Sequence, residues 1–127
     1  MDDMRFSGAM IYARDFSKMQ AFYRDVLQLK PMEETATDTW VEFDTGSTRL
    51  ALHAIPVQIA DGIEISLPPQ PRETNPVKLS FAVEDIAFEN KRLESLGVTV
   101  VRRPWGSYDA MDPEGNIFAI VSHTPRH

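Results

Sequence analysis

Three side chains in predicted strands could do chemistry: Glu42, His53 and Lys78. His53 could act as a general base, contact a ligand, bind a metal, or satisfy a hydrogen bond at a strand end. Glu42 could act as a base, receive a cationic ligand, or neutralise Lys78 or Arg49 in an ion pair. Lys78 could grip a carboxylate or phosphate group. The sequence contains no nucleophile–base motif, phosphate-binding loop or spaced His–Glu pair, so it carries no complete catalytic signature.

Aromatic residues form the second class of candidates. Trp40 and Trp105 are the two tryptophans of the chain. Tryptophan is most often a packing residue, but an indole that faces a pocket suits stacking on a planar ligand or contact with a cation. Both residues are therefore kept as candidate ligand contacts.

These candidates lie in two copies of one pattern. Residues 9–15 and 79–85 are both short apolar strands that end in a polar residue and Asp and lead into a helical stretch, 70 residues apart. Residues 40–44 and 49–54 have counterparts at 108–112 and 117–122, offset by about 68 residues. The repeat predicts two strand–helix–strand–strand–strand modules.

The elements of each module follow from periodicity and from stop signals. In the first module we expect a helix that Asp15 caps and that runs to about Leu27, with strands near 5–14, 32–37, 39–44 and 48–55. In the second we expect a helix over 86–96 that Gly97 ends, with strands near 77–84, 98–103, 107–112 and 116–122.

Composition sets outer bounds on function. With 127 residues, 43% of them hydrophobic, the chain fits one domain with a modest core. A net charge of -6 argues against nucleic-acid partners, and the adjacent pair Arg102 and Arg103 is expected at a solvated strand end or, alternatively, on an anion-facing rim. The absence of cysteine excludes disulfides and thiolate chemistry. An acidic N-terminus and the lack of a long apolar run lead us to expect a cytoplasmic protein without a membrane partner.

A connector at 56–76 is predicted between a first module at 1–55 and a second at 77–127. It contains Pro68, Pro69 and Pro71. Residues 63–67 alternate between polar and apolar and could form a short edge strand. Connections of this length often serve as lids or binding loops, and a plain linker is the other interpretation.

Four segments in order carry a family resemblance: residues 15–27, residues 49–53, Trp105 with Gly106, and the run Asp-Pro-Glu-Gly-Asn-Ile-Phe that begins at Asp112. Together they resemble the vicinal oxygen chelate superfamily, which includes glyoxalase I, bleomycin and fosfomycin resistance proteins and extradiol dioxygenases. The resemblance implies an α+β fold of two βαβββ modules, whose sheets curl into a cup with the helices outside. Gln28 stands where the family usually has Gly after the first helix, which predicts a less relaxed turn.

The resemblance also implies where a metal would be held, on the first and last strands of each module. Carried over position by position, the four ligand sites are Gly8, Ala51, Lys78 and Ala119. Glycine and alanine have no donor atom, and a lysine ammonium has no free lone pair at neutral pH. We therefore expect no metal and no cofactor.

The same positions predict which strand residues face the cup, because side chains alternate across a strand. The third strand of each module is oriented by taking Val41 and Phe43 as core residues, which places Tyr108 and Ala110 in the cup as repeat equivalents of Trp40 and Glu42. The predicted ligand-binding set is Tyr12, Trp40, Glu42, Arg49, His53, Lys78, Trp105 and Tyr108. Apolar surface with sparse polar groups is typical of a pocket for an organic ligand.

Two functions fit these expectations. One is a metal-free binding protein like the bleomycin resistance branch, holding a small organic ligand in the cup. The other is an enzyme related to glyoxalase lyases or to dioxygenases, either metal-free with Glu42 or His53 as base or dependent on a metal with displaced ligands. A homodimer is expected, because the edge strands of an open cup need covering.

Overall fold

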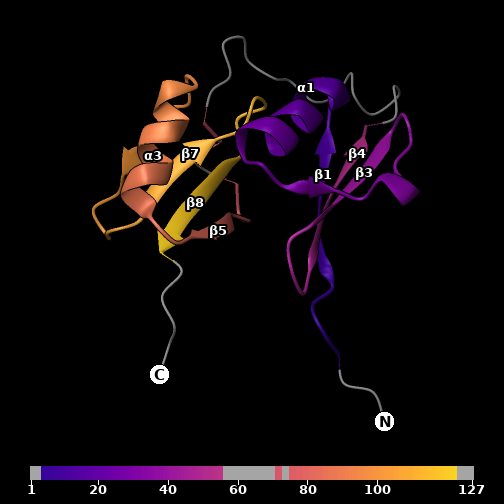
Figure 1. Ribbon diagram of the computed structural model, residues 1–127, viewed down its shortest axis with the longest axis horizontal. Coiled ribbons are helices and arrows are strands. Elements are labelled where there is room, and N and C mark those ends of the chain that lie inside the picture. Colours follow the sequence, from indigo (N-terminus) through magenta and orange to yellow (C-terminus); the bar gives the residue numbers. More distant parts are fainter. Residues whose placement is uncertain (1–3, 56–70, 73–74, 123–127) are drawn as a thin grey trace. The chain divides into compact units, whose positions relative to one another are not determined.

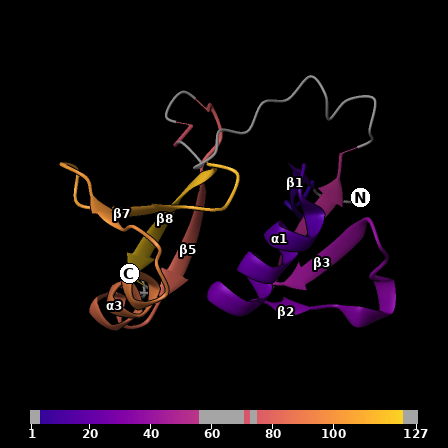
Figure 2. The ribbon, with the colours of Figure 1, turned by 90° about the horizontal axis from the view of Figure 1, so that it is seen from above.

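The computed structural model describes residues 4–55, 71–72 and 75–122. The chain divides into two compact units, Met1–Glu64 and Ile65–His127, each with a four-stranded mixed sheet whose one face is covered by a helix (Figures 1 and 2). This arrangement confirms the predicted α+β class and the two βαβββ modules. The strand predicted at 63–67 lies outside the described residues.

In the first unit the strand order is β1-β4-β3-β2. The strand β1 (Gly8–Ala13) runs parallel to β4 (Arg49–Ala54), which pairs antiparallel with β3 (Trp40–Asp44). The helix α1 (Phe16–Ala21) and the π-helical turn η1 (Phe22–Val26) follow β1 and cover the sheet. The core is built from alternate strand residues and two helix residues that are all buried: Val41, Phe43, Leu50, Leu52, Met19 and Tyr23.

The prediction of a strand at 32–37 is wrong. Strand β2 contains only Lys30–Pro31, and Glu33–Thr35 form the 3-10 turn η2. Pro31 has no N–H to donate to the ladder. The Met32 N–H still donates to the Glu42 carbonyl at 2.8 Å, after which the chain turns away from the sheet.

Gln28 ends the first helix in the left-handed conformation, with a φ of 60°. It is the one residue other than glycine with positive φ in the described part of the chain. Gly97 takes the same role after the helix of the second unit, with a φ of 87°. The left-handed region is unfavourable for a side chain with a Cβ, so the less relaxed turn predicted at Gln28 is confirmed.

In the second unit the strand order is β5-β8-β7-β6. Strand β5 (Leu79–Val83) runs parallel to β8 (Ile117–Ser122), β8 pairs antiparallel with β7 (Tyr108–Met111), and β6 (Val101–Arg102) is the far edge. The helix α3 (Ile86–Ser95) is capped by Asp85, whose carboxylate accepts from the Phe88 N–H at 3.0 Å. Buried Leu93 from α3 and buried Phe118 and Ile120 from β8 form the core.

The turn before the last strand is one residue longer in the second unit. Four residues, 45–48, separate β3 from β4, whereas five, 112–116, separate β7 from β8. As a result Glu42 pairs with Ala51 in the first unit, and Asp109 pairs with Ala119 in the second. Asp109 is therefore the counterpart of Glu42.

This register corrects the predicted orientation of the third strand in the second module. Tyr108 pairs with Ile120, and Ala110 pairs with Phe118, so both lie on the sheet face of the buried core. The prediction that Tyr108 and Ala110 share a face with Ala119 is wrong. A shift of one residue moves every side chain of a strand to the other face, and the longer turn causes that shift here.

No helix within the described ranges is long and apolar enough to cross a lipid bilayer.

Candidate functional site

A pocket of about 180 Å³ lies in the second unit, on the sheet face that carries Asp109 and Ile117. Its wall combines three cationic side chains, one buried carboxylate and one tryptophan: Arg72, Lys78, Arg103, Asp109 and Trp105. Lys78 and Trp105 belong to the predicted ligand-binding set. The other three charged residues were not in that set.

Asp109 is the centre of this charge cluster, and only 3% of it is exposed. Its Oδ2 atom accepts from Lys78 Nζ at 2.6 Å and from Arg103 Nε at 2.8 Å. The buried Oδ1 atom has no hydrogen-bond partner among the described residues. Burial of a carboxylate is costly unless charge compensates it, so the two cations stabilise Asp109 and are in turn fixed by it.

Arg72 reaches the pocket from the end of the connector. Its backbone N–H donates to the Gly115 carbonyl at 3.0 Å, and its Nε atom donates to the Glu114 carbonyl at 3.0 Å. Both acceptors belong to the turn between β7 and β8. That turn is itself held by Asp112, whose carboxylate accepts from the backbone N–H groups of Glu114 and Asn116 at 2.9 and 3.0 Å.

Trp105 gives the pocket an aromatic wall that is 70% exposed. Its indole N–H donates to Ser107 Oγ at 2.9 Å, which fixes the ring. Lys78 Nζ lies 5.7 Å from the ring centroid, and Arg103 Cζ lies 6.0 Å from it. Both cations are within the range of a cation–π contact.

The described residues of the pocket wall carry more positive than negative charge. Arg72, Lys78 and Arg103 are cationic, and Asp109 is the one acid among them. Arg72 pairs with no carboxylate in the described part of the chain. Guanidinium and ammonium groups donate charge-assisted hydrogen bonds to carboxylate and phosphate, so this arrangement suits an anion.

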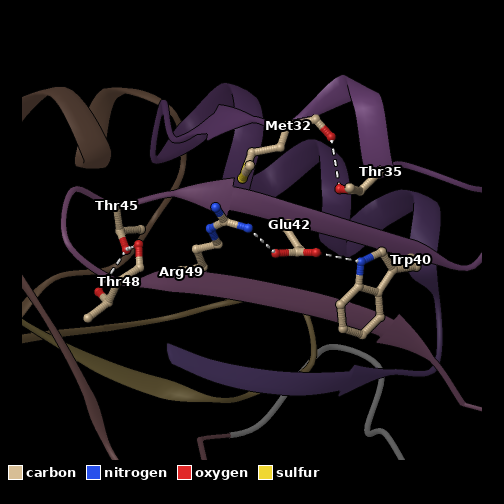
Figure 3. A network of polar contacts seen from close by, with 7 residues as sticks. All are labelled: Met32, Thr35, Trp40, Glu42, Thr45, Thr48 and Arg49. Carbon is tan, nitrogen blue, oxygen red and sulfur yellow. Dashed lines mark hydrogen bonds and ion pairs between the residues drawn. The ribbon is translucent and has the colours of Figure 1, made fainter. Parts of the chain in front are cut away.

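A second polar cluster lies in the first unit, around Glu42 (Figure 3). The Oε1 atom of Glu42 accepts from the Trp40 indole N–H at 3.2 Å, and its Oε2 atom accepts from the Arg49 guanidinium at 3.3 Å. Of the two ion pairs predicted for Glu42, the one with Arg49 is confirmed. Lys78 pairs with Asp109 instead.

His53 lies on the same sheet face as this cluster, between two aromatic rings. Its ring centroid is 5.7 Å from that of Tyr12 and 5.5 Å from that of Trp40, which it meets edge to face. The structure therefore brings together five predicted site residues on one face of the first unit: Tyr12, Trp40, Glu42, Arg49 and His53. It places Lys78 and Trp105 in the pocket of the second unit and Tyr108 on the core face.

Sequence reasoning missed Arg72, Arg103 and Asp109 for separate reasons. Arg103 had a signal, since an anion-facing rim was one interpretation of the Arg102 and Arg103 pair. Asp109 was not predicted to face the pocket, because the predicted register of β7 was wrong by one residue. Arg72 lies in a connector without periodicity, where no pattern predicts a side-chain direction.

The four positions that the resemblance assigns to metal ligands do not fit a divalent ion in this chain. A Cβ atom added to Gly8 would lie 2.1 Å from the Arg49 carbonyl oxygen, so no side chain fits there unless β1 moves. Ala51 and Ala119 are buried and lack donors, and the Lys78 ammonium is bonded to Asp109. Among the described residues no group of three or more His, Asp or Glu could hold a metal.

Comparison with known proteins agrees with this fold. The solved structures of similar architecture include the following three. A lactoylglutathione lyase from Agrobacterium tumefaciens is 26% identical, with a TM-score of 0.61 and coverage of 97% of this chain and 96% of that one. A glyoxalase/bleomycin resistance protein/dioxygenase family enzyme from Burkholderia phytofirmans PsJN is 24% identical, with a TM-score of 0.67 and coverage of 93% and 98%. An integron cassette protein from V. cholerae is 21% identical, with a TM-score of 0.66 and 98% coverage of both chains.

The comparison with curated proteins finds no match. The family model described as the glyoxalase-like domain matches residues 8–121, which span both modules. This match and the solved structures confirm the resemblance to the vicinal oxygen chelate superfamily. The chain belongs to the glyoxalase-like domain family.

Proposed function

We propose that this protein is a metal-free binding protein that holds a small organic ligand in the pocket of the second unit. The observation that carries the proposal is the 2.6 Å contact between Lys78 Nζ and Asp109 Oδ2. It lies at a position that the superfamily resemblance assigns to a metal ligand. An ammonium at this place supplies a fixed positive charge, and it offers no open coordination site.

The surroundings of Lys78 support ligand binding over a purely structural ion pair. A structural pair needs only one cation for one carboxylate, whereas this pocket brings Arg103 to the same oxygen and Arg72 to the same wall. Exposed Trp105 adds apolar area beside the charges. Polar groups that converge on a partly apolar hollow are typical of small-molecule sites.

The first unit offers the alternative function, an enzyme that uses Glu42 or His53 as base. Both carboxylate oxygens of Glu42 already accept hydrogen bonds, from Trp40 and Arg49. His53, in contact with two aromatic rings, is the stronger of the two candidates. Similarity at 26% identity to a lactoylglutathione lyase is the finding that favours this alternative. An assay for that activity, with and without added divalent metal and with His53→Gln as control, tests it.

The binding proposal is tested by thermal unfolding of metal-stripped protein against a panel of small organic anions, cations and neutral compounds. A ligand at about 100 times its Kd stabilises the folded state by about 2.7 kcal/mol. We expect at least one compound to raise the unfolding temperature of the wild type and to lose that effect in Arg72→Gln. Stabilisation by no compound would contradict the proposal.

We also propose a homodimer. In the described part of the chain β1 and β5 are sheet edges, each with a single neighbouring strand. Exposed strand edges are commonly covered by a partner. Sedimentation at tens of micromolar should give the mass of two chains, and a monomer would contradict this expectation.

A further inference from the structure

We propose that the ligand of the second unit's pocket is a single-ring organic anion, with its charged group bound by Arg72, Lys78 and Arg103 and its ring in contact with Trp105. The inference rests on the proposed binding function and narrows it to one chemical class. It follows from four properties of the pocket: the excess of cations among its described lining residues, the free donors of Arg72, the exposed indole and the small volume.

The charge of the pocket selects against cations. Asp109 is the one acid among the described residues of its lining, and its Oδ2 atom already accepts from two cations. Its Oδ1 atom is buried, so it is not open to a cationic ligand. An anion, in contrast, meets the Arg72 guanidinium, which pairs with no carboxylate in the described part of the chain.

Arg72 offers the donors for that anion. Within the described residues its side chain makes one hydrogen bond, from Nε to the neutral Glu114 carbonyl, and pairs with no carboxylate. Its backbone is fixed to the Gly115 carbonyl. Arg72 lines the pocket, and its two terminal guanidinium nitrogens have the geometry to bind two oxygens of one carboxylate or phosphate.

Trp105 supplies the apolar half of the site. It is 70% exposed, a high value for a large aromatic side chain, and it is held in place by Ser107. Lys78 and Arg103 lie within 6.0 Å of the indole centroid. A ligand ring in contact with this indole therefore brings an anionic substituent within reach of both cations.

The size of the pocket matches a ligand of one ring. Its volume is about 180 Å³. Sites for drug-sized ligands are larger, roughly 300–1,000 Å³. Multi-ring compounds and peptides would extend beyond this wall, whereas a benzoate-sized anion fits within it.

The experiment uses benzoate as probe, with phenyl phosphate as a second anion and benzylammonium and benzyl alcohol as cationic and neutral matches. Binding is measured by titration calorimetry and by tryptophan fluorescence in a Trp40→Phe background, where Trp105 is the one remaining indole. The pocket variants are Arg72→Gln, Arg72→Lys and Trp105→Ala. Arg102→Gln is the matched control, because it removes the same charge beside Arg103 but does not line the pocket.

We expect benzoate to bind the wild type, to quench or shift Trp105 fluorescence, and to bind at least about tenfold more weakly in Arg72→Gln, because the charge-assisted hydrogen bonds of the guanidinium are lost. Arg72→Lys should restore part of the affinity, Trp105→Ala should weaken binding several-fold, and Arg102→Gln should stay within about twofold. Tighter binding of phenyl phosphate with the same variant pattern supports the class and identifies phosphate as the preferred anion.

Two other outcomes distinguish failure of the anionic ligand class from failure of the proposed binding function. If benzylammonium or benzyl alcohol binds at least as tightly as both anions and depends on Trp105, the anion class is overturned while the binding function stands. If no probe binds, or binding is indifferent to both Arg72 and Trp105, the pocket is not a site for such ligands and both proposals fall. Unfolding temperatures of all variants establish that losses of binding are not losses of folding.

Discussion

The ammonium of Lys78 lies 2.6 Å from the Oδ2 atom of Asp109, and Arg103 donates to the same oxygen at 2.8 Å. Two cations on one oxygen hold a buried carboxylate whose other oxygen lacks a partner in the described residues. The pocket therefore depends on mutual stabilisation between the Asp109 carboxylate and the two cations, Lys78 and Arg103.

Removal of Lys78 should destabilise the fold. In Lys78→Gln the buried carboxylate keeps only Arg103, and we expect a loss of about 1–3 kcal/mol in the free energy of unfolding. The double variant Lys78→Gln/Asp109→Asn should recover part of that loss, because the buried charge is gone. Urea denaturation measures both. Arg24→Gln, which breaks a solvent-exposed pair with Asp25, is the control and should leave the free energy of unfolding close to that of the wild type. A Lys78→Gln effect no larger than this control would show that the pair is not structural.

Gln28→Gly should stabilise the protein by about 0.5–1 kcal/mol. The left-handed backbone of Gln28 is strained, whereas glycine adopts it without a Cβ clash. The gain from relieving this strain is partly offset by the greater freedom of glycine in the unfolded chain. The reverse change, Gly97→Gln, places a side chain in the same conformation after α3 and should destabilise by a similar amount. Thermal or urea unfolding decides, and effects of the same sign for both changes would refute the explanation.

The modules and their helix caps could be predicted because their signals are local. Asp15 and Asp85 accept from the N–H groups of Lys18 and Phe88 at 3.1 and 3.0 Å, as N-cap spacing requires. Which side chains of β7 face the core could not be predicted, because this depends on one additional residue in the turn before β8. Since side chains alternate along a strand, an error of one residue reverses the orientation of all of them. Arg72 was beyond prediction for another reason: its place is set by two carbonyl groups more than forty residues away.

Asp112→Ala should loosen both the turn and the pocket. The carboxylate is 1% exposed and accepts from two backbone N–H groups and from Asn116 Nδ2 at 2.8 Å. Without the carboxylate these donors would be left unpaired, so we expect the free energy of unfolding to fall by about 2–3 kcal/mol. Since Arg72 is held by this turn, the affinity for benzoate should fall as well, and Asp112→Asn should be milder in both respects. Unchanged stability in Asp112→Ala would contradict the role assigned to the carboxylate.

Glu42→Gln should have little effect. The Arg49 guanidinium is more than half exposed, so its ion pair with Glu42 contributes under about 1 kcal/mol, and an amide oxygen can still accept from Trp40. Urea unfolding and the ligand-dependent thermal shift should both stay close to wild type. A catalytic base at Glu42 would instead show itself as lost turnover in the lyase assay with normal stability.

The most direct test of the account is the metal content of the untagged protein after equilibrium dialysis against zinc, nickel or manganese. Gly8, Ala51 and Ala119 offer no donor atom, and the Lys78 ammonium adds a positive charge at the fourth position. The account predicts well under one ion per chain by elemental analysis and an unfolding temperature that none of the three metals raises. One tightly bound ion per chain, with a raised unfolding temperature, would contradict it.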